Sequence, residues 1–222
     1  MSARSTIAVL GGTGQEGSGL AFRWALHGHE VIIGSRSVEK AAATATALNA
    51  LLAGRGQVEA ASNEEAAASA EIVVLTVPYA AQRSTAEAVR GHLEGKILID
   101  VTVPLAPPVD RVQLPGGESA ALALQRALGG GVKVVSAFQN VSAVHLKDET
   151  HEVDCDVLVC GDDRDARARV IALAADAGLR AWHAGALANA AASEALTSVL
   201  IAINKHYKVK SSGLRITGLP ER

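Results

Sequence analysis

The sequence predicts an α/β protein of the Rossmann type, with a doubly wound, mostly parallel sheet and a C-terminal helical extension. Short apolar runs alternate with helix-length segments along most of the 222 residues, which is typical of parallel strands joined by helical crossovers. Runs such as residues 72–75 have no polar alternation, as expected of strands that are covered on both faces. A glycine cluster follows the first run and opens a helical pattern, which indicates a ligand-binding turn.

The apolar and helical periodicities define the expected elements. Strands are expected at residues 6–10, 30–33, 72–77, 97–103, 132–138, 157–160 and 179–182. Helices are expected at residues 15–27, from Ser37 to about residue 52, and at 187–206. The loop at 104–117 contains four prolines and is long enough to act as a lid. We therefore expect a Rossmann-like domain at 1–185 and a C-terminal helix with a basic tail at 186–222.

Composition and charge narrow the classes of partner. The formal net charge is -2 with both signs interspersed, so no long-range field would attract nucleic acid or an acidic membrane. No stretch reaches the roughly 18 consecutive apolar residues of a membrane span, and residues 1–10 lack the features of a secretory signal. Cys155 and Cys160 are spaced to face opposite sides of a strand, so we expect two packed thiols and no metal site. These features favour a cytoplasmic protein.

The glycine cluster at residues 11–17 is the most informative motif. Gly12, Gly14 and Gly17 have the G-x-G-x-x-G spacing, between a predicted strand and a predicted helix. Gly12 permits a tight turn, Gly14 lets the backbone approach a pyrophosphate, and Gly17 brings the helix close to the strand. The amides of the helix N-terminus then face the anion. A turn without a ligand is the alternative interpretation.

The end of the second strand predicts which dinucleotide is bound. Proteins that prefer NAD usually have Asp or Glu there to bind the adenosine ribose, whereas this chain has Gly34, Ser35 and Arg36. A hydroxyl group and a guanidinium bind the 2′-phosphate of NADP, which a carboxylate would repel. Lys40 lies one helical turn beyond Arg36 and can approach the same phosphate. The alternative is that Arg36 and Lys40 are only the solvated start of a helix.

Several catalytic patterns are absent from the sequence. There is no Tyr-x-x-x-Lys pair and no G-x-S-x-G nucleophile turn, and the seven histidines are scattered. A nicotinamide site without an evident acid or base indicates hydride transfer to an acceptor that brings its own chemistry, such as a flavin-like ring.

Together these motifs resemble the NADPH-dependent reductases of the deazaflavin coenzyme F420, the F420:NADP oxidoreductases. The resemblance extends over nearly the whole chain. It includes residues 10–14, 28–31, 34–36 with Lys40, 74–78, 133–137, 159–163 and 196–197.

The resemblance implies roles for individual residues. Thr13 and the loop amides would hold phosphate, Val77 and Val103 would line the nicotinamide, and Thr197 and Leu214 would lie near the deazaflavin. The full set expected to bind cofactor is Gly12, Thr13, Gly14, Gln15, Glu16, Gly17, Ser35, Arg36, Lys40, Thr76, Val77, Pro78, Val103, Ala143 and Leu214.

The segment after residue 138 departs from the family pattern, which has histidine at Gln139 and proline at Ser142. Gln139 and Asn140 are still able to donate hydrogen bonds to a ring carbonyl, so we expect them, with Thr197, to position the acceptor without acting as acid or base. The alternative is that these amides only tie the strand end to its loop. The basic tail, with Lys205, Lys208, Lys210 and Arg215, either borders the acceptor groove or is a solvated terminus.

The predicted function is reversible hydride transfer between NADP(H) and coenzyme F420. The protein would contribute orientation, proximity and water exclusion. One alternative is an NADPH-dependent reductase of a small imine, a keto acid or a flavin, and another is a noncatalytic NADP(H)-binding redox sensor. The resemblance also implies a homodimer, for which the apolar C-terminal helix is a candidate interface.

Overall fold

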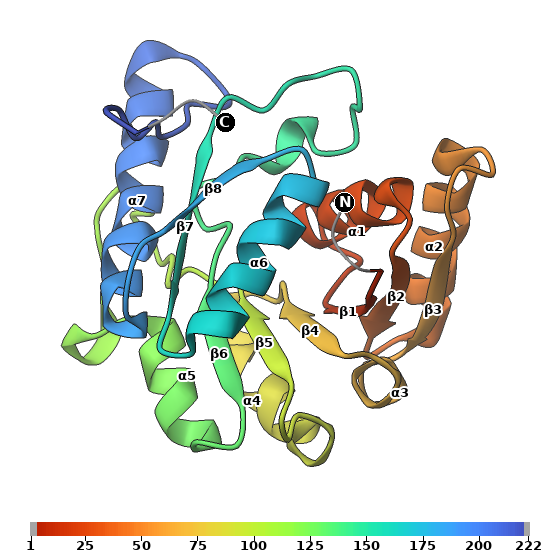
Figure 1. The fold of residues 1–222 in the computed structure, drawn as a ribbon. Coiled ribbons are helices and arrows are strands. Elements are labelled where there is room, and N and C mark those ends of the chain that lie inside the picture. Colours follow the sequence, from red (N-terminus) through yellow and green to blue (C-terminus); the bar gives the residue numbers. More distant parts are fainter. Residues whose placement is uncertain (1–3, 220–222) are drawn as a thin grey trace.

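The computed structural model describes residues 4–219, which form an eight-stranded sheet with helices on both faces (Figure 1). The strand order is β3-β2-β1-β4-β5-β6-β7-β8, and neighbouring strands are parallel except for β6 and β7. The strands are β1 (Thr6–Leu10), β2 (Glu30–Ser35), β3 (Val58–Ser62), β4 (Ile72–Leu75), β5 (Ile97–Asp100), β6 (Lys133–Ser136), β7 (Asp156–Gly161) and β8 (Arg180–His183). Because the chain order reverses between β1 and β4, the carboxyl ends of these strands open a crevice.

Six helices connect successive strands, and they are α1 (Gln15–His27), α2 (Val38–Leu52), α3 (Asn63–Ser69), α4 (Tyr79–Ala88), α5 (Ala120–Leu128) and α6 (Arg164–Asp176). The helix α7 (Ala190–Tyr207) follows the last strand, β8. Four short 3-10 turns are η1 (Arg90–His92), η2 (Pro115–Gly117), η3 (Ala143–His145) and η4 (Leu187–Asn189).

Each face of the sheet has its own hydrophobic core, because successive side chains of a strand point to opposite faces. Ile7 of β1 is completely buried in one core with Trp24 of α1, and the next residue, Ala8, is completely buried in the other. The Trp24 Nε1 donates to the carbonyl oxygen of Leu173 in α6 at 2.8 Å, and its ring meets Phe138 edge-on with centroids 5.9 Å apart. Trp24 thus fixes α1 to α6 and holds the helix that begins at the glycine loop.

The predicted fold class is confirmed, with three differences. The strand β3 was not predicted from its sequence, because only Val58 is buried in it and an apolar run is therefore missing. The strands expected at 72–77, 97–103 and 132–138 end earlier, at Leu75, Asp100 and Ser136, because the following residues turn away from the sheet. The strand β7 runs antiparallel to β6, which an apolar run alone does not reveal.

The C-terminal helix packs against the sheet domain through a buried carboxylate. Glu194 of α7 accepts hydrogen bonds from the backbone amides of Ala120 and Ala121 at 2.8 and 3.2 Å, so it caps the first turn of α5. Burial raises the pKa of Glu194 to about 7, while these two amides oppose the rise. Among residues 4–219 one helical stretch, Leu187–Tyr207, is long and apolar enough by composition to cross a membrane, with mean hydropathy 1.3 and 28% of its apolar window buried.

Candidate active site

A cavity of about 510 Å³ lies at the carboxyl ends of the central strands. Its walls come from the β1–α1 loop, the end of β2, the start of α3, the β4–α4 loop, the segment after β5 and the segment after β6, with one residue from α7. It therefore occupies the crevice at which a doubly wound sheet binds ligands. Of the described residues that line it, Glu16, Arg36 and Tyr79 are titratable.

Three unpaired polar atoms mark this cavity as a binding site. Glu16 Oε1, Asn63 Oδ1 and Gln139 Oε1 are buried without a hydrogen-bond partner, and all three residues line the cavity. An unsatisfied buried polar group costs about 1–3 kcal/mol. The fourth such atom among the described residues, Arg167 Nε, lies outside the lining. The three oxygens are thus positioned to meet polar groups of a ligand.

Protein atoms closely surround the glycine loop at Gly12 and Gly17 and leave space at Gly14. A side chain at Gly12 would meet the Val9 carbonyl at 2.7 Å, and one at Gly17 would meet Thr76 Oγ1 at 2.4 Å. A side chain at Gly14 would touch only the Gly11 carbonyl, at 3.6 Å. Gly14 is also the N-cap of α1 and offers no side-chain cap, so the first amides of the helix are available to an anion.

The end of β2 offers a hydroxyl group and a cation. Ser35 and Arg36 line the cavity, and Ser35 Oγ accepts from the Ser37 amide at 3.2 Å. Arg36 is exposed, as expected of a group that meets a phosphate at the rim. Lys40 is exposed one turn further along α2 and does not line the cavity.

The β4–α4 loop and the segment after β5 form the middle of the cavity. Thr76, Val77 and Pro78 line it, and Thr76 Oγ1 donates to the Leu10 carbonyl at 3.0 Å, which joins this loop to the glycine loop. Val103, from the segment after β5, lines the cavity as well.

A buried carboxyl group supports the segment that follows β5. Asp100 is completely buried, and burial raises its pKa to about 6 against the hydrogen bonds from Thr102 and Gln82. Gln82 Nε2 also donates to Thr102 Oγ1 at 2.9 Å. This contact fixes Thr102 in the cavity wall.

Gln139 presents an acceptor to the cavity, because its donor is already engaged. The Nε2 atom donates to the Asp100 carbonyl at 2.8 Å and to Ser136 Oγ at 2.9 Å. An amide nitrogen has two hydrogens, so neither remains for a ring carbonyl. The free group is Oε1, which suits a ligand that donates a hydrogen bond.

Asn140 and Thr197 connect the segment after β6 to α7. Asn140 Nδ2 donates to the Ser193 carbonyl at 2.8 Å, and Thr197 Oγ1 donates to the Gln139 carbonyl at 2.8 Å. These contacts tie the segment after β6 to α7. Gln139, Asn140 and Thr197 also line a hollow of about 120 Å³ beside the main cavity, together with Ser212 of the tail.

Comparisons with known proteins agree with this geometry. Residues 6–104 match the family model described as NADP oxidoreductase coenzyme F420-dependent. The F420-dependent NADP reductase of Methanothermobacter thermautotrophicus is 44% identical over 224 residues, covering 97% of this chain and 96% of the relative. The chain belongs to the F420-dependent NADP reductase family.

Solved structures place this F420-dependent NADP reductase family member among related folds. A putative F420-dependent NADP reductase from Arthrobacter sp. FB24 superposes with a TM-score of 0.80 at 29% identity, covering 96% of this chain and 99% of the other. An imine reductase from Myxococcus stipitatus superposes with a TM-score of 0.64 at 19% identity, covering 93% and 62%. The second likeness shows the fold alone.

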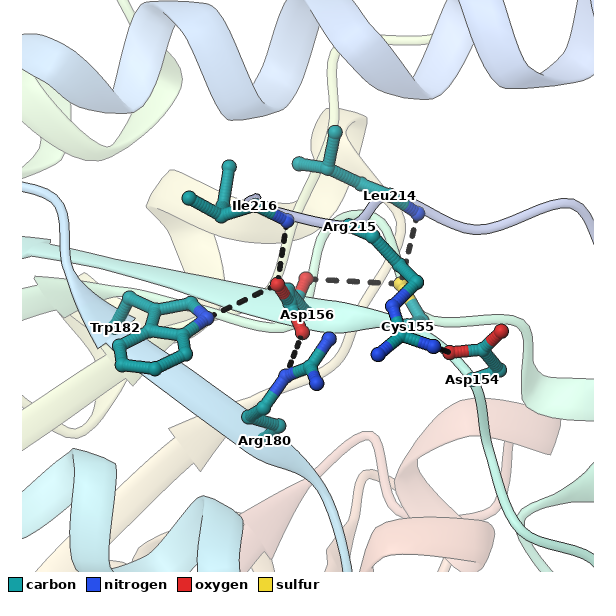
Figure 2. A network of polar contacts seen from close by, with 8 residues as sticks. All are labelled: Asp154, Cys155, Asp156, Arg180, Trp182, Leu214, Arg215 and Ile216. Atoms are coloured by element: carbon teal, nitrogen blue, oxygen red, sulfur yellow. Dashed lines mark hydrogen bonds and ion pairs between the residues drawn. The ribbon is translucent and has the colours of Figure 1, made fainter. Parts of the chain in front are cut away.

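The C-terminal tail of this family member is held on β7 by a buried carboxylate (Figure 2). Asp156 is completely buried and accepts from the Ile216 amide at 2.6 Å, from Trp182 Nε1 at 3.0 Å and from the Arg180 guanidinium. Burial alone would raise the pKa of Asp156, but these three donors outweigh it and leave the pKa lowered. The backbone amide of Asp156 donates in turn to the Leu214 carbonyl at 2.7 Å.

This attachment also reaches Asn140 through a thiol. Cys155 Sγ accepts from the Leu214 amide at 3.5 Å and donates to the Asn140 carbonyl at 3.3 Å (Figure 2 shows the contact with Leu214). Leu214 and Ala143, both expected to bind cofactor, do not line the main cavity or the hollow. The tail residue that lines the hollow is Ser212.

Two of the four basic tail residues form ion pairs with acids. Lys205 pairs with Asp110 in the proline-rich loop at 2.9 Å, and Arg215 pairs with Asp154 at 2.9 Å. Both pairs are largely exposed, so solvent screens them and each adds little to stability. The first pair connects α7 to the loop that was expected to act as a lid.

Asn63 is a polar lining residue that the sequence does not predict. It begins α3 directly after β3 and lines the cavity with Ser35 and Arg36, and its buried Oδ1 has no hydrogen-bond partner. The signal was available in principle, since an asparagine after a strand end is a typical polar ligand. It was lost because β3 itself was not recognised.

Proposed function

We propose that this chain transfers a hydride reversibly between NADP(H) and coenzyme F420. The observation that carries the proposal is the single cavity that runs from the glycine loop to Thr197. One end offers helix amides and Arg36 for phosphates, while the other is lined by Val101, Val103 and Val141. A hydride acceptor with its own conjugated ring needs no acid or base there.

In this mechanism the residues bind, orient and exclude water. The amides at the start of α1 hold the pyrophosphate, and Ser35 with Arg36 holds the 2′-phosphate. NADPH supplies the hydride that the deazaflavin ring accepts. Val77 and Val103 exclude water from the reacting rings, and Gln139 Oε1 accepts a hydrogen bond from one of them. Proximity and orientation lower the reaction barrier in enzymes by roughly 7–11 kcal/mol, and holding the two rings in contact provides several kcal/mol of this reduction.

The deciding experiment mixes the purified protein with NADPH and F420 and follows the absorbance of the deazaflavin. Loss of the F420 band with equal oxidation of NADPH supports the proposal. FMN and pyrroline carboxylate, tested in parallel, separate it from a reductase of a flavin or an imine. Binding of NADPH without turnover of any acceptor would indicate a redox sensor. The apolar end of the cavity argues against this alternative.

We propose further that residues 1–185 bind NADP(H) and that residues 186–222 complete the acceptor site. Support comes from Thr197 in the cavity wall and from Ser212 in the adjoining hollow. The basic residues at positions 205–215 suit the phosphodiester and glutamate groups of F420.

Deleting residues 211–222 is expected to raise the KM for F420 by about tenfold, which corresponds to about 1.4 kcal/mol of lost contact. The KM for NADPH is expected to change less than about twofold, because the deletion leaves the glycine loop and Arg36 in place. Asp154→Asn is the matched control, since it removes only the exposed pair with Arg215. Steady-state kinetics with each substrate varied in turn check this, and equal changes in both KM values would contradict it.

We also propose that the chain is a cytoplasmic homodimer that associates through α7. Val199, Ile203 and Tyr207 lie on one face of this helix at spacings of four residues and are 42%, 38% and 69% exposed. The free, buried Cys155 and Cys160 are consistent with a reducing compartment. Sedimentation equilibrium is expected to give a dimer, and Ile203→Glu a monomer. A monomeric wild-type chain at micromolar concentration would contradict the proposed interface.

A further inference from the structure

Glu16 is an acidic residue in the place where an anion is expected to bind. It is the second residue of α1 and lies in the glycine loop, with its side chain lining the cavity. The residue as a whole is partly exposed, but its Oε1 atom is completely buried and has no hydrogen-bond partner. A carboxylate in this position would face the pyrophosphate that the loop amides are proposed to hold.

No cation of the described structure neutralises Glu16. Arg36, the cation in the cavity wall, follows β2 at the 2′-phosphate end. Arg23, further along α1, directs its guanidinium to carbonyl oxygens of residues 145–151, at 2.7 Å for Leu146. Tyr79 of α4 also lines the cavity, and the elements packed on α1 carry His145 in η3, Glu39 and Lys40 in α2, and the arginines and aspartates of α6. Among the described residues, none of these groups contributes to the pKa shift of Glu16, whose cause is burial.

The physical state of Glu16 follows from these surroundings. Burial raises the pKa of Glu16 to about 8, with no charged neighbour contributing. The carboxyl group is therefore mostly neutral at neutral pH. A neutral carboxyl group is able to donate a hydrogen bond as well as accept one, whereas a carboxylate only accepts.

We propose that Glu16 carries a proton in the NADP(H) complex and donates a hydrogen bond to an oxygen of the bound dinucleotide. This inference rests on the proposed function, because it takes NADP(H) as the ligand of the glycine loop. The dinucleotide brings negative charge close to Glu16 and favours its neutral form further. Binding above the pKa of the free side chain must then take up one proton from the solution.

The sign of the pH dependence follows. Since the pKa of Glu16 is higher in the complex than in the free protein, the affinity for NADPH is constant below the free value and falls above it. With a free pKa of about 8, the Kd is expected to rise by about tenfold between about pH 7 and about pH 9. The 2′-phosphate loses its second proton near pH 6, which is below this range.

Calorimetric titration of the full chain with NADPH tests the inference. Titrations at about pH 9 in two buffers of different ionisation enthalpy are expected to show uptake of about 0.9 proton per site. Glu16→Gln keeps the shape and a donor but has no proton to gain or lose in this range, so it is expected to show no uptake and less than about a twofold change in its own Kd between about pH 7 and about pH 9. Glu39→Gln is the matched control, because Glu39 is exposed near the start of α2.

The outcomes separate this inference from the proposed function. Proton uptake that is lost in Glu16→Gln and kept in Glu39→Gln supports the inference. NADPH binding without uptake in the wild-type chain overturns it, as does equal uptake in Glu16→Gln, and in both cases the proposed function stands. Absence of NADPH binding at every pH overturns the proposed function itself. If Glu16→Gln does not fold, the wild-type titration alone decides whether a proton is taken up.

Discussion

Arg36→Glu is expected to raise the KM for NADPH by about 100-fold, or about 2.7 kcal/mol at 1.4 kcal/mol for each tenfold change. The variant removes a charge-assisted hydrogen bond worth about 1.5–3 kcal/mol and places a carboxylate beside the 2′-phosphate. The KM for NADH is expected to stay within about threefold of the wild-type value, since NADH has no phosphate there. Steady-state kinetics with both cofactors give the comparison.

A matched variant separates the effect of the position of Arg36 from the effect of the change in charge. Lys40→Glu makes the same change of charge one turn further along α2, where the side chain is exposed and does not line the cavity. Its effect on the KM for NADPH is expected to be less than about fivefold, because Lys40 does not line the cavity and a charge at a distance from the phosphate is screened by solvent. Arg36 is exposed as well, so neither variant should lower the thermal midpoint appreciably. Equal increases for NADPH and NADH in Arg36→Glu would remove the assignment of the 2′-phosphate site.

The sequence predicts the central part of this fold better than its edges. The strands β1, β4 and β5 are covered on both faces, so their residues form continuous apolar runs that periodicity detects. The edge strand β3 has one buried residue, and without it the α3 helix and the cavity residue Asn63 were not assigned. Burial on both faces leaves a signal in the sequence, whereas a strand at the edge of the sheet is held by backbone hydrogen bonds that any residue is able to make.

The candidate site likewise contains features that the sequence predicts and features that it does not. Of the residues predicted to bind phosphate, Gly14, Ser35 and Arg36 line one cavity, and the sequence points to them because backbone approach and phosphate charge each require particular residue types. The direction of the Gln139 amide was not readable, since it depends on Asp100 and Ser136, which are brought together only by the pairing of β5 with β6. The role of Asp156 as the anchor of residues 214–216 is likewise a tertiary property, because the two segments are about sixty positions apart.

Two glycine substitutions are expected to distinguish a glycine that the fold requires from a glycine that ligand binding requires. Gly17→Ala should lower the stability of the chain, because the added carbon would lie 2.4 Å from Thr76 Oγ1 and 2.9 Å from the Gly12 Cα. Overpacking of this kind typically costs about 1–3 kcal/mol. The displaced loop should also bind NADPH poorly. Thermal unfolding in the absence of ligand measures the first effect, and fluorescence titration with NADPH measures the second.

Gly14→Ala should leave the stability of the free chain within about 1 kcal/mol of wild type, since alanine loses a little as an N-cap and gains from a stiffer unfolded chain. The backbone at Gly14 has φ -75°, which alanine adopts without strain, and the added carbon meets nothing nearer than 3.6 Å. Its only obstacle is the pyrophosphate that is proposed to approach this backbone. NADPH affinity is therefore expected to fall by more than about tenfold while the thermal midpoint stays unchanged. Wild-type affinity in Gly14→Ala would mean that no ligand approaches the loop at this point. Neither the free structure nor the complex would then explain why this position is glycine.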